Sequence, residues 1–321
     1  MRRVGFAFAA LLIVIGVPLL LAPWFGWGAT PGPAVTVVVA RGASLTSVSR
    51  ELKDAGLVDA AQQFRILARL LGGADPVQAG TYRLTKGDPW RRFLRTMQDG
   101  DVERLALTIP EGLPSIVVAE RLRAEPRLTG AVTVPAEGSV LPETYDFTPG
   151  EPRAAVLARM QAAMVRTTAE LWKGRSARSV VKTPAEAIIL ASIVEKETGK
   201  SVERRQVAGV YSNRLKIGMK LDADPTVIYP LTRGKPLGRR IRKSELAADT
   251  GYNTYLKPGL PAGPIANPGR ASIAAVLDPQ PTEALYFVAD GSGGHVFAAT
   301  LAEHNANVAR WFALRRQRGE M

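Results

Sequence analysis

The feature that most constrains this chain is an apolar stretch close to its N-terminus. Met1-Arg2-Arg3 is followed by Val4–Trp27, which covers 24 residues and contains no charged side chain. A helix needs about 20 apolar residues to cross a bilayer, so this stretch is long enough. A cleaved signal peptide is the alternative, but its apolar region is typically about 7–15 residues long. We therefore expect a retained membrane anchor.

The residues that flank this stretch predict its orientation. Arg2 and Arg3 favour the cytoplasmic side, and Trp24 and Trp27 are expected at the outer interface as an aromatic belt. The remainder of the chain is then extracytoplasmic. The absence of cysteine from all 321 residues agrees with an oxidising compartment.

The composition excludes several classes of chemistry. Without cysteine there is no disulfide scaffold, cysteine-ligated zinc, iron–sulfur cluster or cysteine nucleophile. The only two histidines, His295 and His304, argue against a multi-histidine metal site. We expect neither a metal nor a cofactor, so that hydrolytic or lytic chemistry would depend on carboxylates, hydroxyls, amides or lysines.

The net charge of +13 suggests an anionic partner. Nucleic acid is not expected for an exported chain, and the basic residues are spread along the sequence, with two concentrations at Arg233–Lys243 and Arg310–Arg318. An anionic polymer of the cell envelope or a membrane surface is the better match. A merely solvated basic surface is the alternative for either cluster.

Two similar segments lie 70 residues apart, Val35–Leu52 and Leu105–Leu122. Each reads as a strand, a glycine-containing turn and an amphipathic helix. In the first, a helix over Ala61–Leu71 and a strand near Gly80–Leu84 complete a β-α-α-β module, and Trp90–Met97 predicts one more helix. The order and size of this module resemble a LysM-like carbohydrate-binding module.

The whole chain therefore predicts an α+β fold in four parts. They are a cytoplasmic N-terminus with a single transmembrane helix (1–30), a linker with the LysM-like module (31–100), a second strand-turn-helix unit with a connecting region (101–182), and a catalytic domain (183–321). The last part is rich in rigid Pro/Gly loops that carry polar and aromatic side chains, which suit a sugar groove or serve as structural loops.

A helix with strong start signals opens the last part. Thr183 is a favourable N-cap, Pro184 suits the first helical position, and Glu186 is placed to complete a capping box. Gly199 is a natural residue for the left-handed position that ends a helix.

Two glutamates near the end of this helix point in different directions. At about 100° per residue, Glu197 extends the most apolar stripe, whereas Glu195 points almost oppositely. Burial raises the pKa of a carboxyl group, and the negative end of the helix dipole acts in the same direction. A carboxylic acid that stays protonated near neutral pH can protonate a glycosidic oxygen. The alternative is an ordinary helix-end glutamate, paired with Lys200 or Arg204.

Short motifs throughout the chain occur in a recognisable order. They are AGTYRL (Ala79–Leu84), LPETYDF (Leu141–Phe147), ASIVEKETG (Ala191–Gly199), SNRLKIGMKL (Ser212–Leu221), DPTVIY (Asp224–Tyr229), YNTY (Tyr252–Tyr255), GLPAGPIANPG (Gly259–Gly269), YFVADGSGGHVF (Tyr286–Phe297) and EHN (Glu303–Asn305). In this order they resemble the YceG-like (MltG) family of endolytic murein transglycosylases. The family often has glutamine where this chain has Asp222, which adds a carboxylate near the expected groove.

The resemblance implies an endolytic peptidoglycan lytic transglycosylase that cleaves the β-1,4 bond between MurNAc and GlcNAc in nascent glycan strands. Glu197 corresponds to the catalytic glutamate, acting as general acid and then as general base to leave a 1,6-anhydroMurNAc end. The resemblance also implies the bacterial inner membrane with the catalytic domain in the periplasm, and proximity to peptidoglycan synthases (penicillin-binding proteins). Candidate sugar-binding residues, each of which also reads as a structural loop residue, are Asn213, Asp224, Thr226, Tyr252, Asn253, Tyr255 and His295.

Two other functions fit the sequence. In a two-carboxylate muramidase, Asp222 or Asp224 would activate water and leave reducing MurNAc ends. In a membrane-anchored glycan-binding scaffold for cell-wall synthases, Glu197 would have no chemical role.

Overall fold

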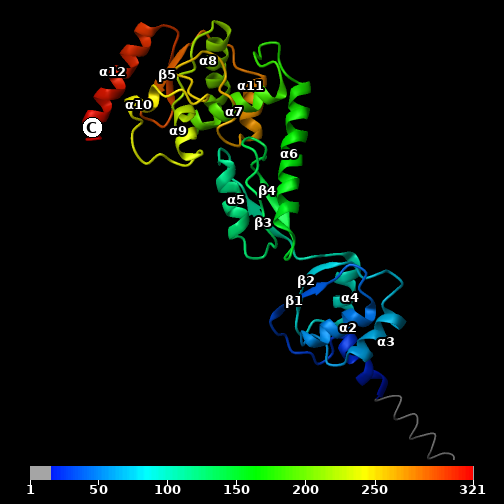
Figure 1. Cartoon of the computed structure of the whole chain (residues 1–321). Coiled ribbons are helices and arrows are strands. Elements are labelled where there is room, and N and C mark those ends of the chain that lie inside the picture. The colour runs from blue at the N-terminus through cyan, green and yellow to red at the C-terminus, as the bar shows by residue number, and fades with distance from the viewer. Residues whose placement is uncertain (1–15, 321) are drawn as a thin grey trace, which may run out of the picture. The chain divides into compact units, whose positions relative to one another are not determined.

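The chain folds into two compact units. The first comprises Met1–Leu105 and Asp146–Gly150, and the second comprises Ala106–Tyr145 and Glu151–Met321. The computed structural model describes residues 16–320 of them (Figure 1). Most of the segment expected as a connecting region, 101–182, belongs to the second unit.

The first unit has the expected β-α-α-β order. β1 (Ala34–Val39), α2 (Leu45–Asp54), α3 (Ala61–Leu71) and β2 (Gly80–Thr85) are followed by α4 (Trp90–Asp99). The two strands pair antiparallel, with Val37 opposite Tyr82. Ser44 caps α2, because its hydroxyl accepts a hydrogen bond from the N–H of Ser47 at 3.1 Å.

The core of the first unit includes the end of the apolar N-terminal stretch. Residues 16–25 are helical. Trp24 is only 3% exposed, and its ring lies 6.4 Å from that of Phe64. Trp27 is 58% exposed and stacks on Phe25. The expectation that Trp24 lies in a membrane interface is wrong, because the core of the module encloses its indole ring.

The structure describes only the second half of the expected transmembrane helix. Its first half, within residues 1–15, lies outside the described residues. From residue 16 onward, no helix has the length and apolar character that crossing a bilayer requires.

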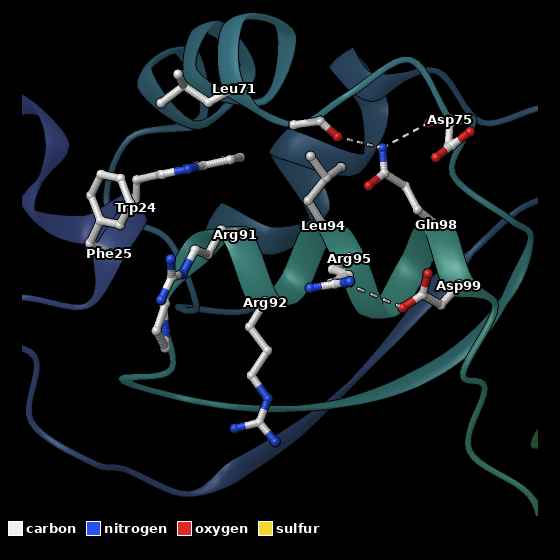
Figure 2. Close-up of a pocket in the computed structure, with 12 residues that line it drawn as sticks. Trp24, Phe25, Leu71, Asp75, Arg91, Arg92, Leu94, Arg95, Gln98 and Asp99 are labelled. Carbon is white, nitrogen blue, oxygen red and sulfur yellow. Dashed lines mark hydrogen bonds and ion pairs between the residues drawn. The ribbon is translucent and has the colours of Figure 1, made fainter.

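A cavity of about 880 Å³ opens on the first unit beside α4. Figure 2 shows Trp24 and Phe25 on one side of it, with the side chains of α4 along another. The guanidinium of Arg91 lies 5.1 Å from the centre of the Phe25 ring. The amide of Gln98 donates to two backbone carbonyls of the loop after α3. The lining therefore combines aromatic surface with groups that form hydrogen bonds.

The second unit is built around α7 (Pro184–Glu197), which packs against α6, α8, α9 and α11. Most of α7 is buried on every side. The elements before α7 are β3 (Leu105–Thr108), which begins at the unit boundary, α5 (Ser115–Ala124), β4 (Thr144–Phe147) and α6 (Arg153–Lys173). Those after it are η1 (Ser201–Glu203), α8 (Arg204–Lys216), α9 (Asp224–Thr232), α10 (Lys243–Leu246), α11 (Arg270–Leu277), β5 (Tyr286–Ala289), β6 (His295–Ala298) and α12 (Leu301–Gln317).

Small two-stranded sheets complete the α+β fold. β3 pairs with β4, and β5 pairs antiparallel with β6 so that Phe287 lies opposite Phe297. Both segments of the internal similarity fold as strand, turn and helix, the first as β1–α2 and the second as β3–α5. α12 covers the β5–β6 hairpin.

Candidate active site

The helix that carries the two glutamates begins at its predicted cap, Thr183, although the predicted capping box does not form. The Thr183 hydroxyl accepts a hydrogen bond from the N–H of Glu186 at 3.1 Å, and Pro184 occupies the first turn. The Glu186 carboxylate bonds the N–H of Lys182 at 2.6 Å, one residue before the cap. These contacts satisfy backbone donors at the helix start and fix where α7 begins.

The end of α7 differs from the expectation. The helix stops because Thr198 is extended, with φ −134° and ψ 131°, and Gly199 does not adopt a left-handed conformation. The Thr198 hydroxyl donates to the Glu203 carboxylate at 3.2 Å and accepts from the N–H of Lys200 at 3.1 Å. The helix therefore ends at Thr198, whose hydroxyl group is held by these hydrogen bonds, and not at a left-handed glycine. Glu197 is the last helical residue.

Glu197 faces residues of two other helices of the second unit. Tyr211 of α8 donates a hydrogen bond to its carboxyl group, Arg214 lies near it on α8, and Asp224 lies near it at the start of α9. The residue as a whole is half-buried, but its carboxyl end is surrounded by protein. Burial raises the pKa of Glu197 to about 7 and the charge of Asp224 adds to this, whereas Tyr211 and Arg214 oppose it.

Glu195 is equally enclosed but has different partners. Its side chain is 5% exposed, and it accepts hydrogen bonds from Nη2 of Arg204 at 3.3 Å and from the N–H of Gly269 at 2.9 Å. Arg204 also binds Glu111 at 2.9 Å. Both glutamates are partly enclosed by protein, so the difference between them lies in their hydrogen-bond partners. Glu195 is committed to an ion pair, whereas Glu197 has no cation within hydrogen-bonding distance among residues 16–320.

Asp224 and Tyr255 form a pair beside Glu197. The hydroxyl of Tyr255 donates to Oδ1 of Asp224 at 2.6 Å. Burial, then Asp224, and also the charge of Glu197 raise the pKa of Tyr255, so its phenol stays protonated. Asp224 is exposed and Tyr255 is half-buried, so both reach the solvent-facing side of the site.

Arg214 is a buried cation at the back of the site. Its Nε donates to the carbonyl of Leu285 at 2.7 Å, and its Nη1 donates to that of Leu221 at 2.7 Å. Its contact with Asp222 is longer, at 3.5 Å, and Asp222 is 38% exposed with a left-handed φ of 48°. The guanidinium is therefore fixed by backbone carbonyls, and it faces both Asp222 and Glu197.

Three of the expected sugar-binding residues are used inside the protein. Thr226 is 0% exposed, and its hydroxyl lies 2.9 Å from that of Thr254. Asn253 is 7% exposed, and its amide donates to the carbonyls of residues 246 and 248. Asn213 donates to the carbonyls of residues 282 and 284. These contacts give all three structural roles, and the burial of Thr226 leaves its hydroxyl no access to a sugar.

Tyr252 keeps an accessible aromatic surface. Its ring lies 4.9 Å from that of Tyr229, and both side chains are half-buried. The Tyr229 hydroxyl donates to Glu137, which also accepts from the N–H and the hydroxyl of Ser115. Burial raises the pKa of Glu137, and these donors oppose the shift.

His295 anchors the β5–β6 hairpin. Its Nδ1 lies 2.8 Å from Glu203, and its backbone N–H donates to the same carboxylate at 3.1 Å. Burial alone would raise the pKa of Glu203, but the hydrogen bonds from His295 and Thr198 outweigh it and lower the pKa. His295 thus ties the hairpin to η1, directly after the helix of Glu197.

Several residues of the site were not expected from the sequence. Tyr211 and Arg214 face Glu197, and Glu137 supports Tyr229, although these four residues come from three separate segments. Tyr211 directly precedes one of the motifs, but nothing in the spacing indicates its partner. From residue 16 to residue 320, no group of three or more His, Asp or Glu side chains is arranged to hold a metal ion.

Comparisons with known proteins agree in one family. The model of the YceG-like family matches residues 37–310. The endolytic murein transglycosylase of Bacillus subtilis is 27% identical over 303 residues, which cover 84% of this chain and 83% of that protein. The endolytic murein transglycosylase of Streptococcus pneumoniae strain D39 is 29% identical over 86% of this chain, which spans 58% of that longer protein. A crystal structure of a YceG-like protein from Listeria monocytogenes is similar with a TM-score of 0.52 and 26% identity, over 86% of this chain and 99% of that one. The chain therefore belongs to the YceG-like family.

Proposed function

We propose that this protein is an endolytic lytic transglycosylase of peptidoglycan and that Glu197 is its catalytic residue. The observation that carries the proposal is the enclosed carboxyl group of Glu197, which has Tyr211 as a hydrogen-bond donor and Asp224 nearby. A pKa of about 7 leaves this group largely protonated in mildly acidic conditions and about half protonated at neutral pH, so it can act as a general acid. The names of the relatives from B. subtilis and S. pneumoniae support the same reaction.

One carboxyl group is sufficient for the proposed reaction. Glu197 donates its proton to the oxygen between MurNAc and GlcNAc as the bond from that oxygen to C1 of MurNAc breaks. The resulting carboxylate then removes the proton of the MurNAc C6 hydroxyl, whose oxygen bonds to C1. The proton returns to Glu197, the product carries a 1,6-anhydro end, and no water is consumed.

The residues around Glu197 support this sequence of steps. Tyr211 and Arg214 stabilise the carboxylate that exists between the two proton transfers. Tyr252 and Tyr255 offer half-buried aromatic surface for sugar rings, and Asp224 offers an exposed acceptor for their hydroxyls.

A muramidase is the second candidate, because Asp224 lies close enough to Glu197 to influence its charge. With a second carboxylate to activate water, the same site would release reducing MurNAc ends. Asp222 is a weaker candidate for the carboxylate that activates water, because it is paired with Arg214 at 3.5 Å.

We propose further that the apolar N-terminal stretch anchors the protein in the bacterial inner membrane, with both units in the periplasm. Here the enzyme would act on nascent strands beside penicillin-binding proteins. The first unit would be a LysM-like module that holds murein, and its cavity of about 880 Å³, with Trp24 and Phe25 on one side, supports this (Figure 2).

Mass spectrometry of the products tests the proposal. The full chain in detergent is incubated with purified peptidoglycan, beside Glu197→Gln and the matched variant Glu195→Gln. We expect anhydro ends from the wild type and from Glu195→Gln, and none from Glu197→Gln. Reducing ends would support the muramidase. Equal anhydro products from the wild type and Glu197→Gln would refute the role of Glu197.

A further inference from the structure

One basic segment of the second unit lies in the chain between two parts of the candidate active site. Segment 233–243, called here the basic rim segment, follows directly after α9, the helix that begins with Asp224. The chain then passes through α10 and returns to Tyr252 and Tyr255. In Figure 1 this part of the chain runs as a long loop between α9 and α10 at the edge of the second unit.

Contacts connect the rim segment, through α10, to the loop that carries Tyr252 and Tyr255. Asn253, two residues before Tyr255, donates to the carbonyls of Leu246 at 2.9 Å and Ala248 at 3.0 Å. At the other end, the Thr232 hydroxyl donates to the carbonyl of Lys235 at 2.6 Å. The rim segment is therefore joined to α10 by the pair of Arg239 with Glu245, and α10 is joined in turn to the loop of Tyr252 and Tyr255.

Most of the positive charge of the rim segment is not neutralised. Its cations are Arg233, Lys235, Arg239, Arg240, Arg242 and Lys243. Lys235 pairs with Glu120, and Arg239 pairs with Glu245. The other four are exposed, and within residues 16–320 they have no carboxylate within 4.0 Å. An unpaired cationic rim beside a site attracts anionic groups of its ligand.

From this arrangement we infer that the basic rim segment binds the carboxylates of the peptides attached to murein, so that the enzyme prefers peptide-bearing strands to bare glycan. The inference rests on the proposed function. In a strand that keeps its peptides, the lactyl carboxyl group of each MurNAc is bound in an amide, so the free carboxylates belong to the stem peptides. An amidase that removes the peptides leaves one lactyl carboxylate on each MurNAc. Each peptide is attached to a MurNAc, the residue whose C1–O bond is cleaved. An extended peptide adds about 3.3–3.6 Å per residue, so a stem of several residues extends well beyond the cleaved bond.

Two substrates and two matched variants test this inference. The full chain is given uncross-linked strands with their peptides, and the same strands after an amidase has removed the peptides. Arg240→Gln/Arg242→Gln removes two unpaired charges of the rim. Arg166→Gln/Arg316→Gln removes two exposed charges elsewhere on the second unit and serves as the control.

We expect the wild type to form anhydro ends faster on peptide-bearing strands. The rim variant should show a KM raised roughly three- to tenfold on these strands, the range that two exposed charge pairs allow, and a smaller increase of the KM on bare strands, whose remaining carboxylates are the lactyl groups on the sugars. The control should behave as the wild type does. Raising the salt concentration should reduce the wild-type preference, because exposed charges are screened over about 8 Å at physiological ionic strength.

Other results would overturn the inference. One is a wild type that cleaves both substrates at the same rate. Another is a rim variant whose KM rises equally on both substrates. Tight binding of the rim to vesicles of anionic phospholipid, without any effect of the peptides, would assign it to a membrane surface instead. A failure of the proposed function is distinguishable, since then neither substrate would yield anhydro ends with any form of the protein, and the inference would fall with it.

Discussion

Replacing Glu197 by glutamine should stabilise the protein at alkaline pH while abolishing its activity. The pKa of Glu197 is about 7, against an ordinary value of 4.5. Because the pKa is raised in the folded state, the folded protein is stabilised relative to the unfolded chain when the carboxyl group is protonated. That stabilisation is fully present below pH 4.5 and is lost as the pH rises to about 7.

The magnitude follows from the difference between the two pKa values. About 2.5 units at about 1.36 kcal/mol each correspond to about 3.4 kcal/mol. Since Glu197 is half-buried rather than fully buried, solvent screening reduces this to about 2–3 kcal/mol. Glutamine has nearly the same shape, cannot ionise, and keeps an oxygen that accepts the hydrogen bond of Tyr211. The variant should therefore be more stable by about 2–3 kcal/mol at pH 8 and by less than about 1 kcal/mol at pH 5.

Urea denaturation of the full chain at pH 5 and pH 8 measures this difference. The matched control is Glu195→Gln, which weakens the contacts with Arg204 and Gly269 and should lower stability at both pH values. A gain for Glu197→Gln that is equal at both pH values would refute the reasoning, as would a loss at pH 8. Either result would mean that burial does not hold this carboxyl group in its protonated form.

Three further perturbations have defined outcomes. Tyr211→Phe removes a donor to the ionised carboxyl group, which should raise the pKa of Glu197 by roughly one to two units. The pH–rate profile should then keep its activity to higher pH, and an unchanged profile would contradict this. Trp24→Ala should destabilise the first unit by about 3–5 kcal/mol, because it empties a core position, and calorimetry should show the transition of the second unit unchanged. Glu195→Ala should cost about 2–3 kcal/mol, because Arg204 loses its buried partner and keeps only the more exposed Glu111, yet it should still give anhydro ends. Loss of anhydro ends without loss of stability would assign the chemistry to Glu195.

Local signals predicted the elements well. The start of α7 followed from Thr183, Pro184 and Glu186, because a cap depends on residues a few positions apart. Its end did not follow from Gly199, because the stop depends on a contact between Thr198 and Glu203, which lies in the next helical turn. A glycine permits a left-handed residue without requiring one.

An apolar stretch of sequence does not show whether its residues lie in a membrane or in the core of a protein. Trp24 satisfies the pattern of a membrane-interface tryptophan, yet the core around Phe64 encloses it. Both surroundings accept an indole, so only the tertiary structure separates them.

The sequence indicated Glu197 as a candidate site residue, but it did not indicate Tyr211 or Arg214, which lie beside it. Tyr211 follows Glu197 by 14 positions, and no periodicity relates residues of two different helices. Thr226 and Asn253 were expected as sugar ligands because each is a polar residue in one of the short motifs. Thr226 instead lies in the first turn of α9, where its hydroxyl bonds the carbonyl of Ala223 and the hydroxyl of Thr254. The Asn253 amide bonds the carbonyl of Leu246 at the end of α10.

The side chain of Asn267 has a consequence for the order in which the protein folds. Its oxygen accepts from the N–H of Val140, and its Nδ2 donates to the carbonyl of Leu113 and to Glu137, contacts that span between 127 and 154 residues of chain. Contacts between such distant segments must close long loops before they contribute stability, so they form late in folding. The segments that position Tyr229 therefore come together only after most of the polypeptide has been synthesised. A chain that ends before this asparagine would carry Glu197 but would lack the contacts that join Glu137, the partner of Tyr229, to the segments of Leu113 and Val140.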